Sequence, residues 1–117
     1  MHTWQRAVRS WVERVLGTDN MKPRIRALRF AEESIELCQA AGMLEEDYIK
    51  LVHRVYSKPT GEVKQEVGGV FVTFLAFCSG LNVDAYECLV TEFNRIGDPK
   101  MKAKIVASDD NKREAGL

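Results

Sequence analysis

The sequence has no excess of charge of either sign. Seventeen lysines and arginines balance seventeen aspartates and glutamates among 117 residues, so the formal net charge is zero. Nucleic-acid-binding proteins normally carry a basic excess, because neutralising phosphates supplies most of their affinity. The balance therefore argues against a DNA- or RNA-binding module and leaves only a local basic patch open.

Cysteines and long apolar runs are also scarce. The three cysteines, Cys38, Cys78 and Cys88, are an odd number, and no pair has the spacing of a metal site, which indicates reduced, buried thiols. No apolar run approaches the roughly 20 residues of a membrane span, and no apolar signal core follows the first residues. We expect a cytoplasmic protein with no membrane partner.

What the chain has throughout is the apolar spacing of helices. Apolar side chains recur at steps of three and four in residues 3–16, 23–41, 44–56, 62–79, 82–96 and 100–107. Gly17, Gly42 and Gly80 stand where three of these helices should end. Pro23 suits the first turn of a helix, and Asn82 suits the cap before residues 82–96.

These segments predict an all-α fold, an antiparallel bundle of four to five helices. There is no internal repeat, low-complexity stretch or linker in the sequence, so residues 1–117 are predicted to form a single domain. Residues 1–20 supply its N-terminal helix, and the polar tail, residues 108–117, is expected to fray.

One stretch, residues 70–77, is apolar on nearly all sides. Its β-branched content would also suit a strand, but it continues the helical spacing of residues 62–70 and has no second strand to pair with. A helix that is apolar all round is buried on most sides, either within the bundle or between subunits. On a chain of this length, the stretch favours an oligomer.

Glu32, Glu33 and Glu36 are the first candidates for chemistry. In a helix, Glu33 and Glu36 lie three residues apart and Glu32 and Glu36 four apart, so they share a face. Magnesium is a hard cation that binds carboxylate oxygens, water and substrate phosphates. On its own, the same spacing is also typical of a solvated helix face.

A second candidate is Glu66, which precedes the most apolar part of its predicted helix. The neighbouring Gly68 and Gly69 each cost a helix roughly 1 kcal/mol, which suggests that another backbone or a ligand approaches closely there. The alternative is a tight crossing of two helices without a ligand.

Two segments together resemble a known family. Residues 29–37 read Arg-Phe-Ala-Glu-Glu-Ser-Ile-Glu-Leu, residues 65–70 read Gln-Glu-Val-Gly-Gly-Val, and a Pro-Thr-Gly-Glu turn lies between them. This order resembles the MazG-like nucleotide pyrophosphohydrolases, and more narrowly their small phage and prophage members, over roughly residues 26–96. The resemblance implies a MazG-like helical fold, assembly as a homodimer or homotetramer, and a phage-encoded protein in the host cytoplasm.

The family pattern is Glu-x-x-Glu on one helix and Glu-x-x-Asp on a later, antiparallel one. The resemblance makes Glu33, Glu36 and Glu66 the ligands of Mg²⁺, with Mn²⁺ as a substitute, and Glu32 a further catalytic carboxylate. Gly69 stands where the family has its aspartate, so one ligand is missing. Candidates for a replacement oxygen are Glu32, Glu62, Glu92 and water.

The implied activity is hydrolysis of a nucleoside or deoxynucleoside triphosphate between its α and β phosphates, giving the monophosphate and pyrophosphate. Metal-activated water suffices for this reaction, and the sequence offers no convincing serine, cysteine or histidine nucleophile. Basic residues that could bind the phosphates are Arg29, Lys64, Arg95 and Lys102. The alternatives, which Gly69 favours, are a catalytically degenerate nucleotide- or metal-binding protein and a helical protein-interaction module.

Overall fold

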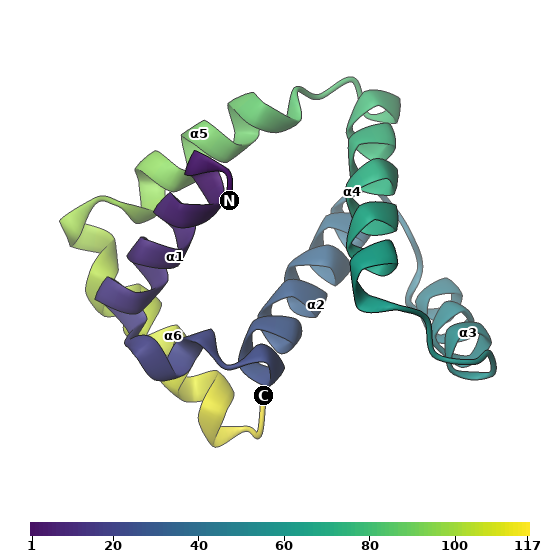
Figure 1. Cartoon of the computed structure of the whole chain (residues 1–117), viewed down its shortest axis with the longest axis horizontal. Helices are drawn as coiled ribbons and strands as arrows, with labels where there is room; N and C mark the ends of the chain where they lie inside the picture. The colour runs from purple at the N-terminus through teal and green to yellow at the C-terminus, as the bar shows by residue number, and fades with distance from the viewer. The chain divides into compact units, whose positions relative to one another are not determined.

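The computed structural model describes all 117 residues, and its regular structure is entirely helical (Figure 1). The six α-helices are α1 (Thr3–Leu16), α2 (Pro23–Ala40), α3 (Glu45–Tyr56), α4 (Val63–Gly80), α5 (Ala85–Ile96) and α6 (Lys102–Glu114). Two short 3₁₀ helices, η1 (Thr18–Met21) and η2 (Pro99–Met101), precede α2 and α6. The predicted all-α class is confirmed, with six helices instead of four to five, and residues 70–77 are helical.

The helix ends show which sequence signals act locally. Pro23 begins α2 and Gly80 is the last residue of α4, as predicted. The prediction for Asn82 is wrong, because its backbone is left-handed, with φ of 55°, and closes the end of α4. Asp84 caps α5 instead, since its carboxylate accepts a hydrogen bond from the Glu87 N–H at 2.9 Å.

A repeat that the sequence does not reveal is visible in the helix boundaries. α2 and α4 both have 18 residues, and α3 and α5 both have 12. α4 begins 40 residues after α2, and α5 begins 40 residues after α3. Among the residue pairs that this offset aligns in the helices, only Cys38 and Cys78 are identical, so the correspondence lies in the helix boundaries and not in the sequence.

The turns within the two repeats are closed in the same way. The N–H of Met43 donates to the carbonyl of Cys38, and the N–H of Val83 donates to that of Cys78, both at 3.0 Å. Each turn has a left-handed residue just before that donor, with φ of 93° at Gly42 and 55° at Asn82. This pattern is the Schellman motif, which satisfies carbonyls that a helix end leaves unpaired.

The last helix extends further than its sequence suggests. The apolar spacing ends near residue 107, but α6 continues to Glu114. Asp109 lies within this extension and is buried. A buried carboxylate needs partners, and those partners, described below, hold the polar tail in helical form.

Residues 1–34 and 90–117 form one compact unit, and residues 35–89 form another. In the first, which we call the terminal unit, the ring of Trp4 meets that of Phe93 edge to face with centroids 5.6 Å apart. The indole N–H of Trp11 donates to the carbonyl of Ile96 at 3.2 Å. Trp11 and Val12 are the buried apolar residues of this unit, so its apolar core is small.

The second unit, residues 35–89, which we call the central unit, buries one residue, Cys78. Apolar side chains along α4 are exposed, among them Phe71 and Val72 at 55% and 69%. No single helix of the chain combines the length and the apolar character that a membrane crossing needs.

Candidate functional site

The predicted acidic face lies on α2, an uninterrupted helix. Glu33 and Glu36 are three residues apart on it, and both are exposed. Neither carboxylate takes part in an ion pair, whereas Glu32 is half-buried and its Oε1 lies 2.7 Å from the Nζ of Lys112 on α6. The structure therefore separates Glu32, which is paired with Lys112, from Glu33 and Glu36, which are exposed and make no ion pair.

Arg95, near the end of α5, is the basic group whose charge is coupled to this face. Its guanidinium donates to both carboxylate oxygens of Glu92, at 2.7 and 2.8 Å. These hydrogen bonds and the charge of Glu92 raise the pKa of Arg95, and the charge of Glu33 contributes a smaller effect in the same direction. The side chain of Arg95 is 53% exposed, so its contact with Glu92 can exchange for contact with an anion at little cost.

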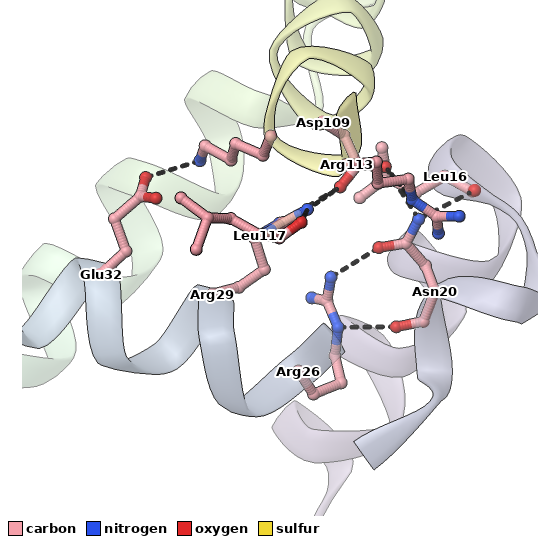
Figure 2. Close-up of polar contacts among 9 residues, drawn as sticks. Leu16, Asn20, Arg26, Arg29, Glu32, Asp109, Arg113 and Leu117 are labelled. Carbon is pink, nitrogen blue, oxygen red and sulfur yellow. Dashed lines mark hydrogen bonds and ion pairs between the residues drawn. The ribbon is translucent and has the colours of Figure 1, made fainter. Parts of the chain in front are cut away.

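On the same helix as Glu32 lies part of a partly buried polar network, which we call the arginine–aspartate cluster (Figure 2). Its members are Asn20, Arg26, Arg29, Asp109 and Arg113. Oδ1 of Asp109 accepts hydrogen bonds from Nη2 and Nε of Arg29 at 2.8 and 3.2 Å. Oδ2 of Asp109 accepts from the side-chain amide of Asn20 at 3.0 Å and from Nε of Arg113 at 3.2 Å. One carboxylate thus joins η1, α2 and α6.

Asn20 extends the cluster toward the start of the chain. It is completely buried, and its amide also donates to the carbonyl of Leu16 at 3.3 Å. Arg26 holds it from the other side, donating from Nε to the backbone carbonyl and from Nη2 to the side-chain oxygen, both at 2.7 Å (Figure 2). Every hydrogen-bonding atom of the Asn20 side chain therefore has a partner, as burial requires.

The charges of the cluster are unequal, with three guanidinium groups around one carboxylate. Burial alone would raise the pKa of Asp109, but hydrogen bonds from Asn20 and Arg29 and the charges of Arg29 and Arg113 outweigh it, so the pKa is lowered. Burial, and then the charge of Arg29, lower the pKa of Arg26. Nη1 of Arg29 is buried without a protein partner.

Sequence reasoning missed most of this cluster. Arg29 was expected to be a free phosphate-binding group, but its side chain is only 13% exposed and is committed to Asp109. Asp109 falls in the tail expected to fray, and Asn20 falls in a segment recognised only as a helix stop. The partners lie 80 and 89 residues apart in sequence, and no local spacing signals such a contact.

Glu66, the third predicted ligand, lies in the first turn of α4 and is exposed. The side chain of Glu62 precedes it as the helix cap and accepts hydrogen bonds from the backbone N–H groups of Lys64 and Gln65, at 3.1 and 2.8 Å. A Cβ added at Gly68 or Gly69 would meet nothing within 4 Å. The expectation of a close backbone approach at these two glycines is therefore wrong for the residues of this chain.

The predicted metal ligands are carboxylates, which suit a hard cation, but they do not form a recognisable metal site in the structure. Carboxylate oxygens are the ligands that Mg²⁺ prefers, and Glu33, Glu36 and Glu66 supply them without thiolates or imidazoles. No group of three or more acidic, histidine or cysteine side chains in the structure has the geometry to hold a metal ion. Two of the predicted phosphate-binding residues, Lys64 and Lys102, are exposed at the starts of α4 and α6.

Comparisons with known proteins give no relative to set beside this geometry. No family model matches the chain, and neither a curated protein nor a solved structure matches it.

Proposed function

We propose that this chain is a Mg²⁺-dependent nucleoside triphosphate pyrophosphohydrolase with a MazG-like fold that works as a homo-oligomer. The observation that supports the proposal best is the pair Glu33 and Glu36. Both lie on one face of an uninterrupted helix, both are exposed, and neither is neutralised by an ion pair. The charged groups next to them on α2, Arg29 and Glu32, are already paired with α6, whereas Glu33 and Glu36 make no ion pair.

In the proposed reaction, water adds to a phosphorus of the α–β anhydride, the bridging P–O bond breaks, and the products are a nucleoside monophosphate and pyrophosphate. Glu33, Glu36 and Glu66 would hold the metal ion, which when bound neutralises phosphate charge and acidifies a water molecule. Glu32 is the carboxylate that we assign to accept the proton of that water. Its contact with Lys112 fixes the direction in which its carboxylate points.

The phosphate chain carries more negative charge than one metal ion neutralises. The exposed side chains of Arg95, Lys64 and Lys102 supply the remaining positive charge in this proposal. Arg29 contributes less directly, because Asp109 occupies its Nε and Nη2. We therefore assign it to holding α2 in place rather than to contacting substrate.

The test is release of pyrophosphate from a panel of ribo- and deoxyribonucleoside triphosphates with and without Mg²⁺. We expect Glu36→Gln to lower kcat/KM by at least about 100-fold, since even residues that only support metal ligands cost 10- to 100-fold when changed. The matched control is Glu46→Gln, an exposed glutamate in the first turn of α3, which should keep the parent rate. Equal rates for parent and Glu36→Gln contradict the assignment.

The second candidate is a protein that binds nucleotide or metal without turnover. Gly69 favours it, because the family's fourth ligand is missing there, and so does the lack of a three-residue metal group. Calorimetry distinguishes the two candidates. The second candidate is supported if nucleotide binds in the presence of Mg²⁺ and no substrate of the panel releases pyrophosphate. If the protein binds neither nucleotide nor metal, a helical protein-interaction module is the remaining interpretation.

A further inference from the structure

The turn before α4 contains a glycine whose missing side chain has a specific neighbour. A Cβ added at Gly61 would overlap Oε1 of Glu66 and would lie 3.1 and 3.3 Å from its Cδ and Cγ. The Glu66 side chain therefore folds back along α4 and fills the space that any other residue at position 61 would need. Both residues belong to the central unit, so this is a local contact.

The backbone does not require glycine at this position. The glycines with positive φ are Gly17, Gly42 and Gly116, and only such a conformation excludes other residues. Gly61 has an ordinary φ, so alanine can adopt its backbone without strain. The consequence of a side chain at position 61 is therefore limited to displacing the carboxylate of Glu66.

The other glycines of α4 differ in this respect. A Cβ at Gly68, Gly69 or Gly80 would meet nothing within 4 Å. The chain thus offers a glycine-to-alanine substitution with a carboxylate in its path, at Gly61 before α4, and others without one, within α4. Gly68 is the matched control, because it lies in the helix interior and has no assigned role in the site.

We propose that Gly61 is a positioning residue for Glu66. By lacking a side chain, it allows the Glu66 carboxylate to lie against the first turn of α4, where the cap formed by Glu62 fixes the backbone. This is the conformation in which Glu66 serves as a metal ligand, so the inference rests on the proposed function. Glu66 is exposed, and a side chain at position 61 would exclude this conformation from the rotamers that a glutamate on a surface turn can adopt.

The first measurement does not depend on metal or activity. In Gly61→Ala, the added methyl group must displace the carboxylate, so the ¹³Cδ chemical shift and the χ1-dependent couplings of Glu66 should change. In Gly68→Ala they should stay as in the parent. Unchanged Glu66 signals in Gly61→Ala overturn the proposal, because the carboxylate then does not occupy the space at position 61.

The second measurement is Mn²⁺ affinity by calorimetry, with Mn²⁺ as the probe in place of Mg²⁺. We expect Gly61→Ala to weaken binding about tenfold, the lower end of what changes around a metal ligand cost, and Gly68→Ala to leave it unchanged. In a Glu66→Gln background, Gly61→Ala should cause no further loss, because the ligand through which it acts is gone. A further loss of similar size in that background contradicts action through Glu66.

The two hypotheses fail in different ways. A parent that binds Mn²⁺ no more tightly than Glu66→Gln overturns the proposed ligand set, and with it the metal-positioning role of Gly61. A parent that binds Mn²⁺ through Glu66, together with a Gly61→Ala variant that binds equally well, overturns only the role of Gly61.

Discussion

Two arginines, Arg29 and Arg113, donate hydrogen bonds to the carboxylate of Asp109 in the terminal unit, and a third, Arg26, donates to Asn20. Asp109 accepts hydrogen bonds from Asn20, Arg29 and Arg113, and its side chain is 9% exposed. Removing one member of a buried ion pair is costly because the other charge stays behind without a partner. Without the Asp109 carboxylate, the charge of Arg29 would stay behind without its partner, and the Nη1 of Arg29 already has none.

We predict that Asp109→Asn lowers the free energy of unfolding by about 3 kcal/mol at neutral pH, the lower end of the loss expected when a buried pair is broken. Urea unfolding measures this loss. The control is Asp110→Asn, whose side chain is exposed and whose effect should stay within about 0.5 kcal/mol. Equal losses for the two variants would show that the cluster does not stabilise the fold.

The same variant gives a pH-dependent signature. The pKa of Asp109 is lowered on folding, so its contribution is fully present above the unfolded pKa of about 3.9 and is lost as pH falls through the folded value. The difference in unfolding free energy between parent and Asp109→Asn should therefore be largest near pH 7 and shrink below pH 4. A difference that stays constant from pH 7 to pH 3 argues against an ionised Asp109 in the folded state.

At the scale of helices and turns, the sequence is most informative where the signal is local. Pro23 marks the start of α2 because its ring fixes φ and removes an N–H, and Gly80 marks the end of α4 because glycine is a poor helix former. Asn82 misleads because asparagine suits both an N-terminal cap and a left-handed residue. The hydrogen bond from Val83 to Cys78 decides between them, and it depends on the turn geometry rather than on the residue type.

Two glycines near helix ends, Gly42 after α2 and Gly80 at the end of α4, provide a test of this reasoning. A Cβ would meet nothing within 4 Å at either Gly42 or Gly80, but φ is 93° at Gly42 and ordinary at Gly80. Gly42→Ala should lower the free energy of unfolding by about 1–2 kcal/mol, the cost of a left-handed residue with a side chain.

Gly80→Ala should raise it by about 0.5–1 kcal/mol, because alanine favours the helix and restricts the unfolded chain. Thermal unfolding of the two variants measures the contrast. Destabilisation by both substitutions to the same extent would mean that the backbone conformation at position 42 does not account for the effect.

At the scale of the whole chain, the sequence predicts the fold class but not the features that depend on contacts between residues far apart in the chain. Periodicity predicts helices, but the cluster at Asp109 joins residues 80 and 89 positions apart. The 40-residue repeat is hidden because different side chains fill equivalent helices. Spacing alone predicts that Glu33 and Glu36 share a face of α2. It does not predict that Arg29 and Glu32 form ion pairs with residues of α6.

The zero net charge also conceals an asymmetry between the two units. The terminal unit has thirteen basic and nine acidic residues, and the central unit has four basic and eight acidic ones. The zero net charge of the whole chain therefore does not exclude nucleic-acid binding by the basic terminal unit. Opposite charge on the units also favours association between copies of the chain, since potentials of opposite sign steer encounter.

Self-association is the last prediction, and it follows from how little the central unit buries. Its 55 residues bury one side chain, Cys78, whereas a stable domain of about 60 residues hides about 60% of the surface that its unfolded chain exposes. Val67, Phe71 and Val72 on α4 are 61%, 55% and 69% exposed. A second copy that covers these side chains would supply the missing burial, at about 25 cal/mol for each Å² of apolar surface.

Light scattering should therefore give at least twice the monomer mass at micromolar concentration, and the melting temperature should rise with protein concentration. Val72→Glu places a charge among the exposed apolar side chains of α4 and should shift the chain toward monomer while lowering that temperature. The matched control is Tyr56→Glu, because Tyr56 is 85% exposed at the end of α3 and lies outside α4. A parent chain that is monomeric and whose melting temperature is independent of concentration contradicts the prediction, since the exposed apolar side chains of α4 would then have no second copy to cover them.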